Sequence, residues 1–239
     1  MIWCLHGFLG RGADWEPLRA ACAAAGLPPV EAPDLFAREP FGPRAGSLAA
    51  WGAWFAAHVA ERDPEPVIVG YSLGGRLALH ALLAPAAAWH AAVIVSAHPG
   101  LDADEARARR LADDEHWARR FARDGWESLL ADWNAQPVFG PQPPLSDRSE
   151  EAYDRPALAA ALRHWSVGSQ EPLIERLAAV RRRVLWIAGQ HDATFVALGA
   201  AAVRALPRGE LRVAPGAGHR VPWENGAWFE ETVCGWLDQ

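Results

Sequence analysis

Short apolar runs alternate with longer amphipathic stretches along most of the chain. Six of the runs have the length and the bounding turn residues of buried strands. They are residues 3–6, 29–33, 67–70, 91–96, 183–189 and 210–214. Stretches with helical patterning lie between them, at residues 14–25, 48–61, 73–83, 195–206 and 224–237. This alternation predicts an α/β fold, with a mostly parallel sheet of about six strands and helices on both faces.

Residues 100–170 break this rhythm. They are helix-forming, charged and rich in Trp, with a Pro-rich interruption at 137–145 and no convincing strand. The strand pattern resumes at Val184, which favours an insertion over a second independent domain. We therefore expect one core, made of residues 1–99 and 171–239, and a helical cap over 100–170 that acts as a lid.

Composition narrows the class of protein and of partner. The chain has 239 residues, of which 51% are hydrophobic and 22% charged, as in a packed globular protein. Its formal net charge is −6 and it has no basic face, so nucleic acid is not an expected partner. No segment is long and apolar enough for membrane insertion, and the N-terminus lacks the pattern of a secretory signal. The oligomeric state is not predicted.

The cysteines indicate the compartment. Cys4, Cys22 and Cys234 are odd in number, widely separated and without metal-ligand spacing. They therefore favour neither a disulfide framework nor a zinc site. We expect a cytoplasmic protein with no metal, and the absence of a Gly-rich phosphate or dinucleotide fingerprint predicts no cofactor.

The strongest local signal is the run VIVGYSLGGRLAL, residues 67–79. In it a buried strand leads into the GxSxG pattern of residues 70–74, and then into a helix. A turn of this kind holds Ser72 on a sharp, strained bend, while the flanking glycines admit close backbone approach. The N-terminus of the following helix also points N–H groups at developing negative charge. Ser72 is therefore the predicted reactive residue.

A serine hydroxyl needs a histidine to accept its proton and an acid to orient that histidine. Asp192 follows the strand at 183–189 and His219 follows the strand at 210–214, so both lie at carboxyl ends of strands. The order Ser, Asp, His is the one expected with this type of turn. We predict the triad Ser72, Asp192 and His219. His191 is the chief rival for the base, and Asp34 is a weaker candidate for the acid.

An oxyanion hole needs two converging backbone N–H groups. One is expected from the residue after the serine, Leu73, and the other from the loop after the first strand. That loop has the sequence HGF, in which Gly7 lets the chain turn back beneath a reacting carbonyl. The second predicted donor is Phe8.

Several segments together resemble one family. They are LHGFLGRGADW, GYSLGGRLAL, SAHPGL, DWNAQPVF, GQHDATF and GAGHRVPWEN. From Trp3 to near the C-terminus, the chain resembles the 2-succinyl-6-hydroxy-2,4-cyclohexadiene-1-carboxylate synthases of menaquinone biosynthesis, which have the α/β-hydrolase fold. The resemblance implies elimination of pyruvate from a small polyanionic carboxylate substrate, with the serine acting as a base.

The resemblance also implies substrate-binding residues. Arg76 and Arg110 are candidates to pair with substrate carboxylates. Tyr71 and Trp133 match positions that line the family's site.

The chain also departs from the family. It opens directly on the HGF strand, so we expect the usual N-terminal strand pair to be absent. Residues 34–40 replace a DLPGHG-like turn, and one cap arginine of the family has no clear counterpart. Arg148 or Arg155 could substitute for it.

Two other functions stay open at this point. One is a hydrolase of small carboxylic esters that uses the same triad through an acyl-enzyme. It differs from the lyase in the charge of the site, because an esterase tolerates an apolar cleft without converging arginines. The other is a non-enzymatic binding module on a decayed fold, which predicts that a member of the triad is missing.

Overall fold

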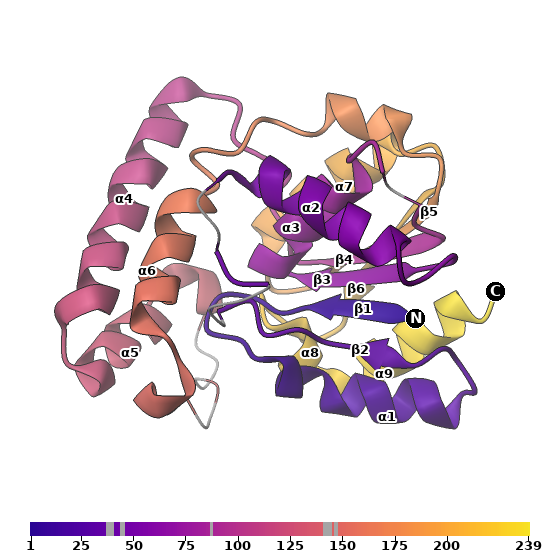
Figure 1. Cartoon of the computed structure of the whole chain (residues 1–239), viewed down its shortest axis with the longest axis horizontal. Helices are drawn as coiled ribbons and strands as arrows, with labels where there is room; N and C mark the ends of the chain where they lie inside the picture. Colours follow the sequence, from indigo (N-terminus) through magenta and orange to yellow (C-terminus); the bar gives the residue numbers. More distant parts are fainter. Residues whose placement is uncertain (37–40, 44–45, 87, 141–144, 146–147) are drawn as a thin grey trace.

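A computed structural model describes the chain except residues 37–40, 44–45, 87, 141–144 and 146–147 (Figure 1). Parts of two segments singled out above, 34–40 and 137–145, therefore lie outside the described residues. The strands form one sheet of order β2-β1-β3-β4-β5-β6, and all neighbouring pairs are parallel. They are β1 (Ile2–Leu5), β2 (Val30–Glu31), β3 (Val67–Tyr71), β4 (Ala91–Val95), β5 (Arg183–Gly189) and β6 (Gly209–Ala214). The predicted α/β fold with a parallel sheet of about six strands is confirmed.

Helices cover both faces of the sheet. Figure 1 shows α2, α3 and α7 on one side and α1, α8 and α9 on the other. These helices are α1 (Glu16–Ala24), α2 (Leu48–Ala60), α3 (Leu73–Leu82), α7 (Ala193–Ala205), α8 (Val221–Glu224) and α9 (Gly226–Leu237). Successive strand residues face opposite layers, so Trp3 and Leu5 pack with α2 and α3 while Ile2 and Cys4 pack with α1 and α9.

Proline explains several shifted element boundaries. The strand predicted at 29–33 is only Val30–Glu31, because Pro29 and Pro33 have no N–H to donate to the ladder. The helix predicted at 14–25 starts as the 3₁₀ turn η1 (Gly12–Trp15), and α1 begins with Pro17 in its first turn. The helix predicted at 224–237 is α9, which begins at Gly226, after the separate short helix α8 that has Pro222 in its first turn.

The segment between β4 and β5 is helical and contains no strand among its described residues. Its helices stand beyond the carboxyl ends of the strands, where the arrow of β1 points in Figure 1. They are α4 (Asp104–Arg123), α5 (Trp126–Asn134) and α6 (Arg155–His164), with the short turns η2 (Pro137–Phe139), η3 (Glu150–Ala152) and η4 (Glu175–Ala179). Helix α4 packs along α6, with Phe121 and Leu158 fully buried.

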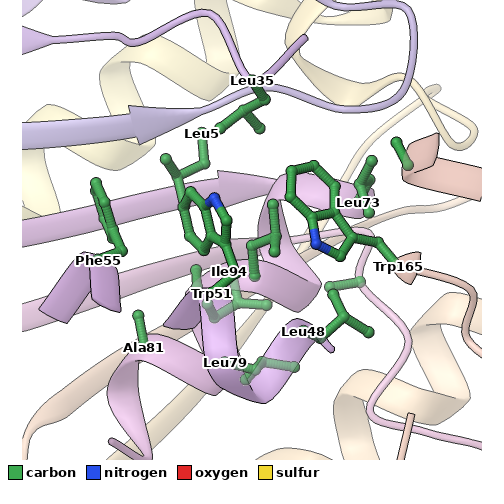
Figure 2. Close-up of a cluster of buried hydrophobic side chains, with 14 of the residues drawn as sticks. Leu5, Leu35, Leu48, Trp51, Phe55, Leu73, Leu79, Ala81, Ile94 and Trp165 are labelled. Atoms are coloured by element: carbon green, nitrogen blue, oxygen red, sulfur yellow. The ribbon is translucent and has the colours of Figure 1, made fainter. Parts of the chain in front are cut away.

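A tryptophan joins this helical segment to the core. Figure 2 shows Trp165, just after α6, beside Trp51 of α2 and Leu73 of α3. The rings of Trp165 and Trp51 meet edge to face, with their centroids 5.9 Å apart. Trp165 is 1% exposed, so a large apolar area of the helical segment is buried against α2 and α3.

Burial of His80 in α3 makes stability depend on pH. Burial lowers the pKa of His80 to about 4, and the nearby charges of Arg76 and Arg176 lower it as well. The unfolded chain, with an ordinary histidine pKa near 6.5, therefore takes up this proton first as the solution is acidified. The stabilisation is complete above that pH and is lost progressively as the pH falls toward 4.

We predict that between about pH 7 and about pH 4.5 the wild-type protein loses about 1–3 kcal/mol more unfolding free energy than a His80→Leu variant. Denaturant unfolding at each pH measures the difference. Equal losses in the two proteins would contradict the assignment.

Candidate active site

Ser72 lies on the turn between β3 and α3, in a backbone conformation that side chains rarely adopt. Its φ is 51° and its ψ is −110°. Such a conformation costs of the order of 1–3 kcal/mol and persists only where its surroundings enforce it. Here the Ser72 N–H donates to the Val95 carbonyl at 2.8 Å, and its carbonyl accepts from Arg76 N in the first turn of α3. The turn is thus anchored both to the sheet and to the helix.

Close backbone contacts require glycine at two positions of the turn. A Cβ on Gly74 would overlap the carbonyl oxygen of Leu5, and a Cβ on Gly70 would lie 2.5 Å from the carbonyl oxygen of Gly74. No L side chain fits at either position without moving the backbone. The two glycines of the GxSxG pattern are therefore needed for α3 to start so close to β1.

The three predicted triad residues meet. His219 Nε2 lies 3.1 Å from Ser72 Oγ, and His219 Nδ1 lies 2.9 Å from Asp192 Oδ2. The carboxylate neighbour assigns the imidazole proton to Nδ1, so Nε2 is left to accept the Ser72 hydroxyl proton. The second oxygen of Asp192 accepts from Phe195 N at 3.3 Å and caps α7, which holds the carboxylate in place.

The rival residues lie elsewhere. His191 is exposed. Asp34 accepts a hydrogen bond from Gly12 N at 2.6 Å, as expected of a residue that holds a loop.

The loop after β1 is held next to the turn. His6 is buried, donates from Nδ1 to the Gly7 carbonyl and accepts from Leu35 N at Nε2, each at 2.9 Å. Burial lowers the pKa of His6, which keeps the ring neutral and able to accept. A Cβ on Gly7 would lie 2.7 Å from the Tyr71 ring, so glycine allows the loop to pack there. The roles of the Phe8 and Leu73 N–H groups as the oxyanion hole stay a prediction.

A cavity of about 340 Å³ opens over Ser72 and His219. The predicted residues Phe8, Tyr71, Leu73, Arg76, Arg110 and Trp133 all line it. Its floor comes from the carboxyl ends of the strands. Its roof comes from α4, α5 and η2, where the Trp133 ring packs 4.7 Å from the Phe8 ring between centroids.

The two predicted arginines have different surroundings. Arg76 is 9% exposed, and its guanidinium donates to the Trp165 carbonyl at 2.6 Å and to Gln170 Oε1 at 3.5 Å. Burial lowers the pKa of Arg76 to about 9, with a further contribution from Arg110, so it remains a cation at neutral pH. Arg110 is more exposed, and its Nε pairs with Asp114 Oδ1 at 2.9 Å.

Sequence comparison decides the family. A profile of the α/β hydrolase family matches residues 4–232. The chain belongs to the α/β-hydrolase family. A 2-succinyl-6-hydroxy-2,4-cyclohexadiene-1-carboxylate synthase of Photorhabdus laumondii is 30% identical over 98% of this chain and 83% of its own length. A synthase of the same name from Escherichia coli is 31% identical over 93% of this chain and 88% of its own length.

The chain thus belongs to the synthase group of this family, as its motifs indicated, and it is an enzyme. MenH from S. aureus has the same fold, with a TM-score of 0.89 at 21% identity over 99% of this chain and 92% of that one. A thermophilic esterase from Thermogutta terrifontis shares the fold, with a TM-score of 0.76 at 20% identity over 99% of this chain and 89% of that one.

The structure separates the two candidates for the absent cap arginine. Arg148 lines the cavity, and its Nη2 reaches both carboxylate oxygens of Asp14 at 3.0 and 2.8 Å. Arg155 lies outside the cavity lining and donates to the carbonyls of Phe121 and Asp124, each at 2.6 Å.

Sequence reasoning missed three residues of the site. Asp114 is a buried carboxylate one helical turn after Arg110, a spacing that signals an ion pair but not a cavity. Arg220 follows His219 directly and lines the cavity. Glu224 accepts hydrogen bonds from the backbone on both sides of His219. No local pattern distinguishes these two from ordinary surface charges.

The described residues contain no group of three or more His, Cys, Asp or Glu side chains arranged to hold a metal ion. None of the helices among them is both long and apolar enough to cross a membrane.

The packing of Gly74 yields a matched test. We predict that Gly74→Ala loses more than about 2 kcal/mol of unfolding free energy and abolishes labelling of Ser72 by a fluorophosphonate, since the new methyl group displaces α3 from β1. Gly235 lies in α9 with open space around a Cβ, so Gly235→Ala is expected to gain up to about 1 kcal/mol. Denaturant unfolding and serine labelling of both variants measure this. Normal labelling in Gly74→Ala would show that the contact is not needed.

Proposed function

We propose that this enzyme eliminates pyruvate from 2-succinyl-5-enolpyruvyl-6-hydroxy-3-cyclohexene-1-carboxylate to give 2-succinyl-6-hydroxy-2,4-cyclohexadiene-1-carboxylate. The observation that carries the proposal is the buried guanidinium of Arg76 in the same cavity as Ser72 and His219. A cavity built for neutral esters has no use for a desolvated cation. The names of the relatives in Photorhabdus laumondii and Escherichia coli point to the same reaction.

The bonds that break and form follow from the chemical structures of the proposed substrate and product. The ring C2–H is acidic because it lies next to the succinyl ketone. Ser72, with its proton passed to His219 Nε2, removes this hydrogen as a base. The electron pair forms C2=C3, the existing double bond moves to C4=C5, and the C5–O bond breaks. The leaving group departs as the enolate of pyruvate and takes up one proton, equal to the one removed from C2, to become pyruvate, so the balance needs no water, oxidant or cofactor.

The triad and the oxyanion hole have separate roles in this step. Asp192 fixes the imidazole and stabilises its protonated form. The N–H groups of Phe8 and Leu73 stabilise the negative charge that develops on the succinyl ketone oxygen as the ring carbon loses its proton.

The substrate carries several carboxylates, and the arginines of the cavity are their partners. The described hydrogen-bond acceptors of the Arg76 guanidinium, a carbonyl and an amide oxygen, are both neutral. A substrate carboxylate therefore adds the first strong counter-charge to these described hydrogen bonds. Arg110 shares its charge with Asp114 and lies nearer to solvent. Arg148, and not Arg155, replaces the absent cap arginine. Tyr71 and Trp133 supply apolar walls that orient the ring.

The helical segment between β4 and β5 acts as a lid over the cavity. Residues 1–99 and 171–239 form the core that holds the triad, and residues 100–170 form the cap. The cap supplies Arg110 and Trp133 to the cavity, so its seating completes the binding site and excludes water. Three free cysteines support a reducing compartment, and we place the enzyme in the cytoplasm.

Hydrolysis of a small carboxylic ester is the second candidate. The Ser72 to His219 geometry suits an acyl-enzyme as well as a base, and the likeness to an esterase fold is consistent with it. The two functions differ in the need for cations at the cavity wall. A non-enzymatic role is disfavoured because no member of the triad is missing.

The first test of the lyase is release of pyruvate from the proposed substrate. We expect turnover by the wild-type protein, and a loss of about 10³-fold or more in Ser72→Ala, since the reacting hydroxyl is gone. A coupled lactate dehydrogenase assay measures pyruvate, and a short-chain ester is the parallel substrate. Ester cleavage without pyruvate release would make the enzyme a hydrolase.

Substitution of Arg76 tests whether a cation in the cavity binds the substrate. We predict that Arg76→Met raises KM for the polyanionic substrate by about 10–100-fold, because one buried charge-assisted pair is lost. The rate of cleavage of a neutral ester is expected to stay within about twofold of the wild-type rate. Arg109→Met, on the exposed side of α4, is the matched control and is expected to change neither value. If Arg76→Met and Arg109→Met have the same KM, Arg76 does not bind the substrate.

A further inference from the structure

A second histidine lines the cavity, and the mechanism proposed above gives it no role. His98 lies shortly after β4, in the HPGL segment of the sequence, and is partly buried. Its ring lies edge to face with the Phe195 ring, with the centroids 6.3 Å apart. The same phenyl ring lies 4.6 Å from the His219 ring between centroids. His98 is therefore near the base but belongs to a different strand end.

The backbone that carries His98 is tightly fixed where the chain leaves β4. Ser96 has a φ of 46°, a strained value for a residue with a side chain, and its N–H donates to the Ile187 carbonyl at 2.9 Å. Gly100 has a φ of 116°, and a Cβ there would lie 2.7 Å from the Glu171 carbonyl oxygen. These two positions fix the path of the short segment between them, and strain of this kind gathers at functional sites.

A backbone hydrogen bond fixes the tautomer of His98. The Gly100 N–H donates to His98 Nδ1 at 3.1 Å, so the ring hydrogen of the neutral imidazole is on Nε2. Burial lowers the pKa of His98 to about 4, with further contributions from Arg76 and Arg110, so the ring is neutral at pH 7. Nε2 makes no hydrogen bond to any of the described residues. The cavity wall thus holds a neutral N–H donor that has no acceptor among them.

Gln170 links His98 to Arg76. Its Nε2 donates to the His98 carbonyl at 3.0 Å, and its Oε1 accepts from the Arg76 guanidinium at 3.5 Å. The Gln170 side chain is 1% exposed, so this bridge is inside the protein. A cation and a neutral donor are therefore neighbours on one wall of the cavity.

The enolpyruvyl group of the proposed substrate has two acceptors that suit this pair. Its carboxylate is attached to the carbon that bears the ether oxygen, so the two acceptors lie side by side. The carboxylate is charged throughout the reaction and suits Arg76. The ether oxygen is neutral until the C5–O bond breaks and then becomes the enolate oxygen. A neutral N–H binds the enolate oxygen much more strongly than the ether oxygen, and this difference lowers the barrier.

We propose that His98 is a further catalytic residue, whose Nε2–H donates a hydrogen bond to the oxygen that leaves C5 of the ring. His98 stabilises the enolate as the C5–O bond breaks, while Arg76 holds the adjacent carboxylate. The imidazole acts as a neutral electrophile and keeps its own hydrogen, so the proton balance of the step is unchanged. The inference rests on the proposed function, because it needs this leaving group.

Steady-state release of pyruvate tests the role of His98. We expect His98→Leu to lower kcat about 100-fold, as when one preorganised donor is removed, and to change KM less than about threefold. His98→Gln keeps an N–H donor near the position of Nε2 and is expected to recover kcat to within about tenfold of the wild-type value. His116→Leu, exposed on α4, is the matched control and keeps the wild-type kcat.

A second variant keeps the local hydrogen bond and removes only the donor. The side-chain oxygen of His98→Asn can accept from Gly100 N, but this shorter side chain has no donor at the position of Nε2. We expect it to be as slow as His98→Leu. Thermal melting checks that each variant folds, and His98→Asn carries the test if His98→Leu does not fold.

Labelling of Ser72 by a fluorophosphonate separates this role from damage to the triad. The probe reacts through the serine and histidine and has no enolpyruvyl group. His98→Leu and His98→Asn are therefore expected to label within about twofold of the wild-type rate, measured by intact mass.

Oxalate gives a readout that needs no turnover. It carries a carboxylate beside an anionic oxygen, as the enolate of pyruvate does. We expect oxalate to protect Ser72 from the fluorophosphonate, and the half-protecting concentration to rise about tenfold in His98→Leu, since a hydrogen bond to a charged oxygen is lost. Succinate, whose carboxylates are not adjacent, is expected to protect both proteins equally.

A wild-type kcat in folded His98→Leu and His98→Asn would overturn the proposal. So would an equal loss of labelling and of kcat, which would place the effect in the triad. A rise in KM with unchanged kcat would make His98 a binding residue only. If the wild-type enzyme releases no pyruvate, the proposed lyase function fails by itself. Oxalate protection that is equal in the wild type and His98→Leu, or absent from both, would then overturn the role of His98 as well.

Discussion

Helix α3 starts so close to β1 that a Cβ on Gly74 would overlap the carbonyl oxygen of Leu5, and the site is arranged around this approach. The strained backbone of Ser72 is held by its hydrogen bonds to Val95 at the end of β4 and to Arg76 in α3. The same approach places the loop after β1 beside Ser72, at the N-terminus of α3. The N–H groups of both segments form the oxyanion hole that we predict for negative charge developing there. One close contact between backbones thus sets the serine and the predicted oxyanion loop together.

The electrostatics of the cavity contrast with those of the whole protein. The chain carries a net charge of −6, yet Arg76, Arg110, Arg148 and Arg220 all line one cavity. Arg110 pairs with the Asp114 carboxylate, and Arg148 pairs with the Asp14 carboxylate. These acids offset part of the positive charge, because a cluster of cations is costly in a partly desolvated space. The polyanionic substrate that we propose would bind among these arginines.

Coupling between the cap and the core is a second theme. Trp165 packs on α2, Arg148 pairs with Asp14 of the core, and Arg220 reaches Asn134 of the cap. Each of these links joins residues far apart in the sequence, and each lies at the wall of the cavity. If the cap is a lid, as we propose, closing it changes packing, ion pairing and the surroundings of His219 together. This is the behaviour expected of a lid that completes a site rather than one that merely covers it.

The sequence by itself determined the parallel sheet and the places of Ser72, Asp192 and His219. Each of these residues follows a strand in a short local pattern, and the carboxyl ends of parallel strands must share one edge of the sheet. It left the choice between Arg148 and Arg155 open, and it missed Asp114, Arg220 and Glu224. Only the tertiary structure decided where these side chains lie, because that depends on which side of a helix or loop meets the cavity. Such contacts join residues up to 134 positions apart, as for Arg148 and Asp14, and no local pattern encodes them.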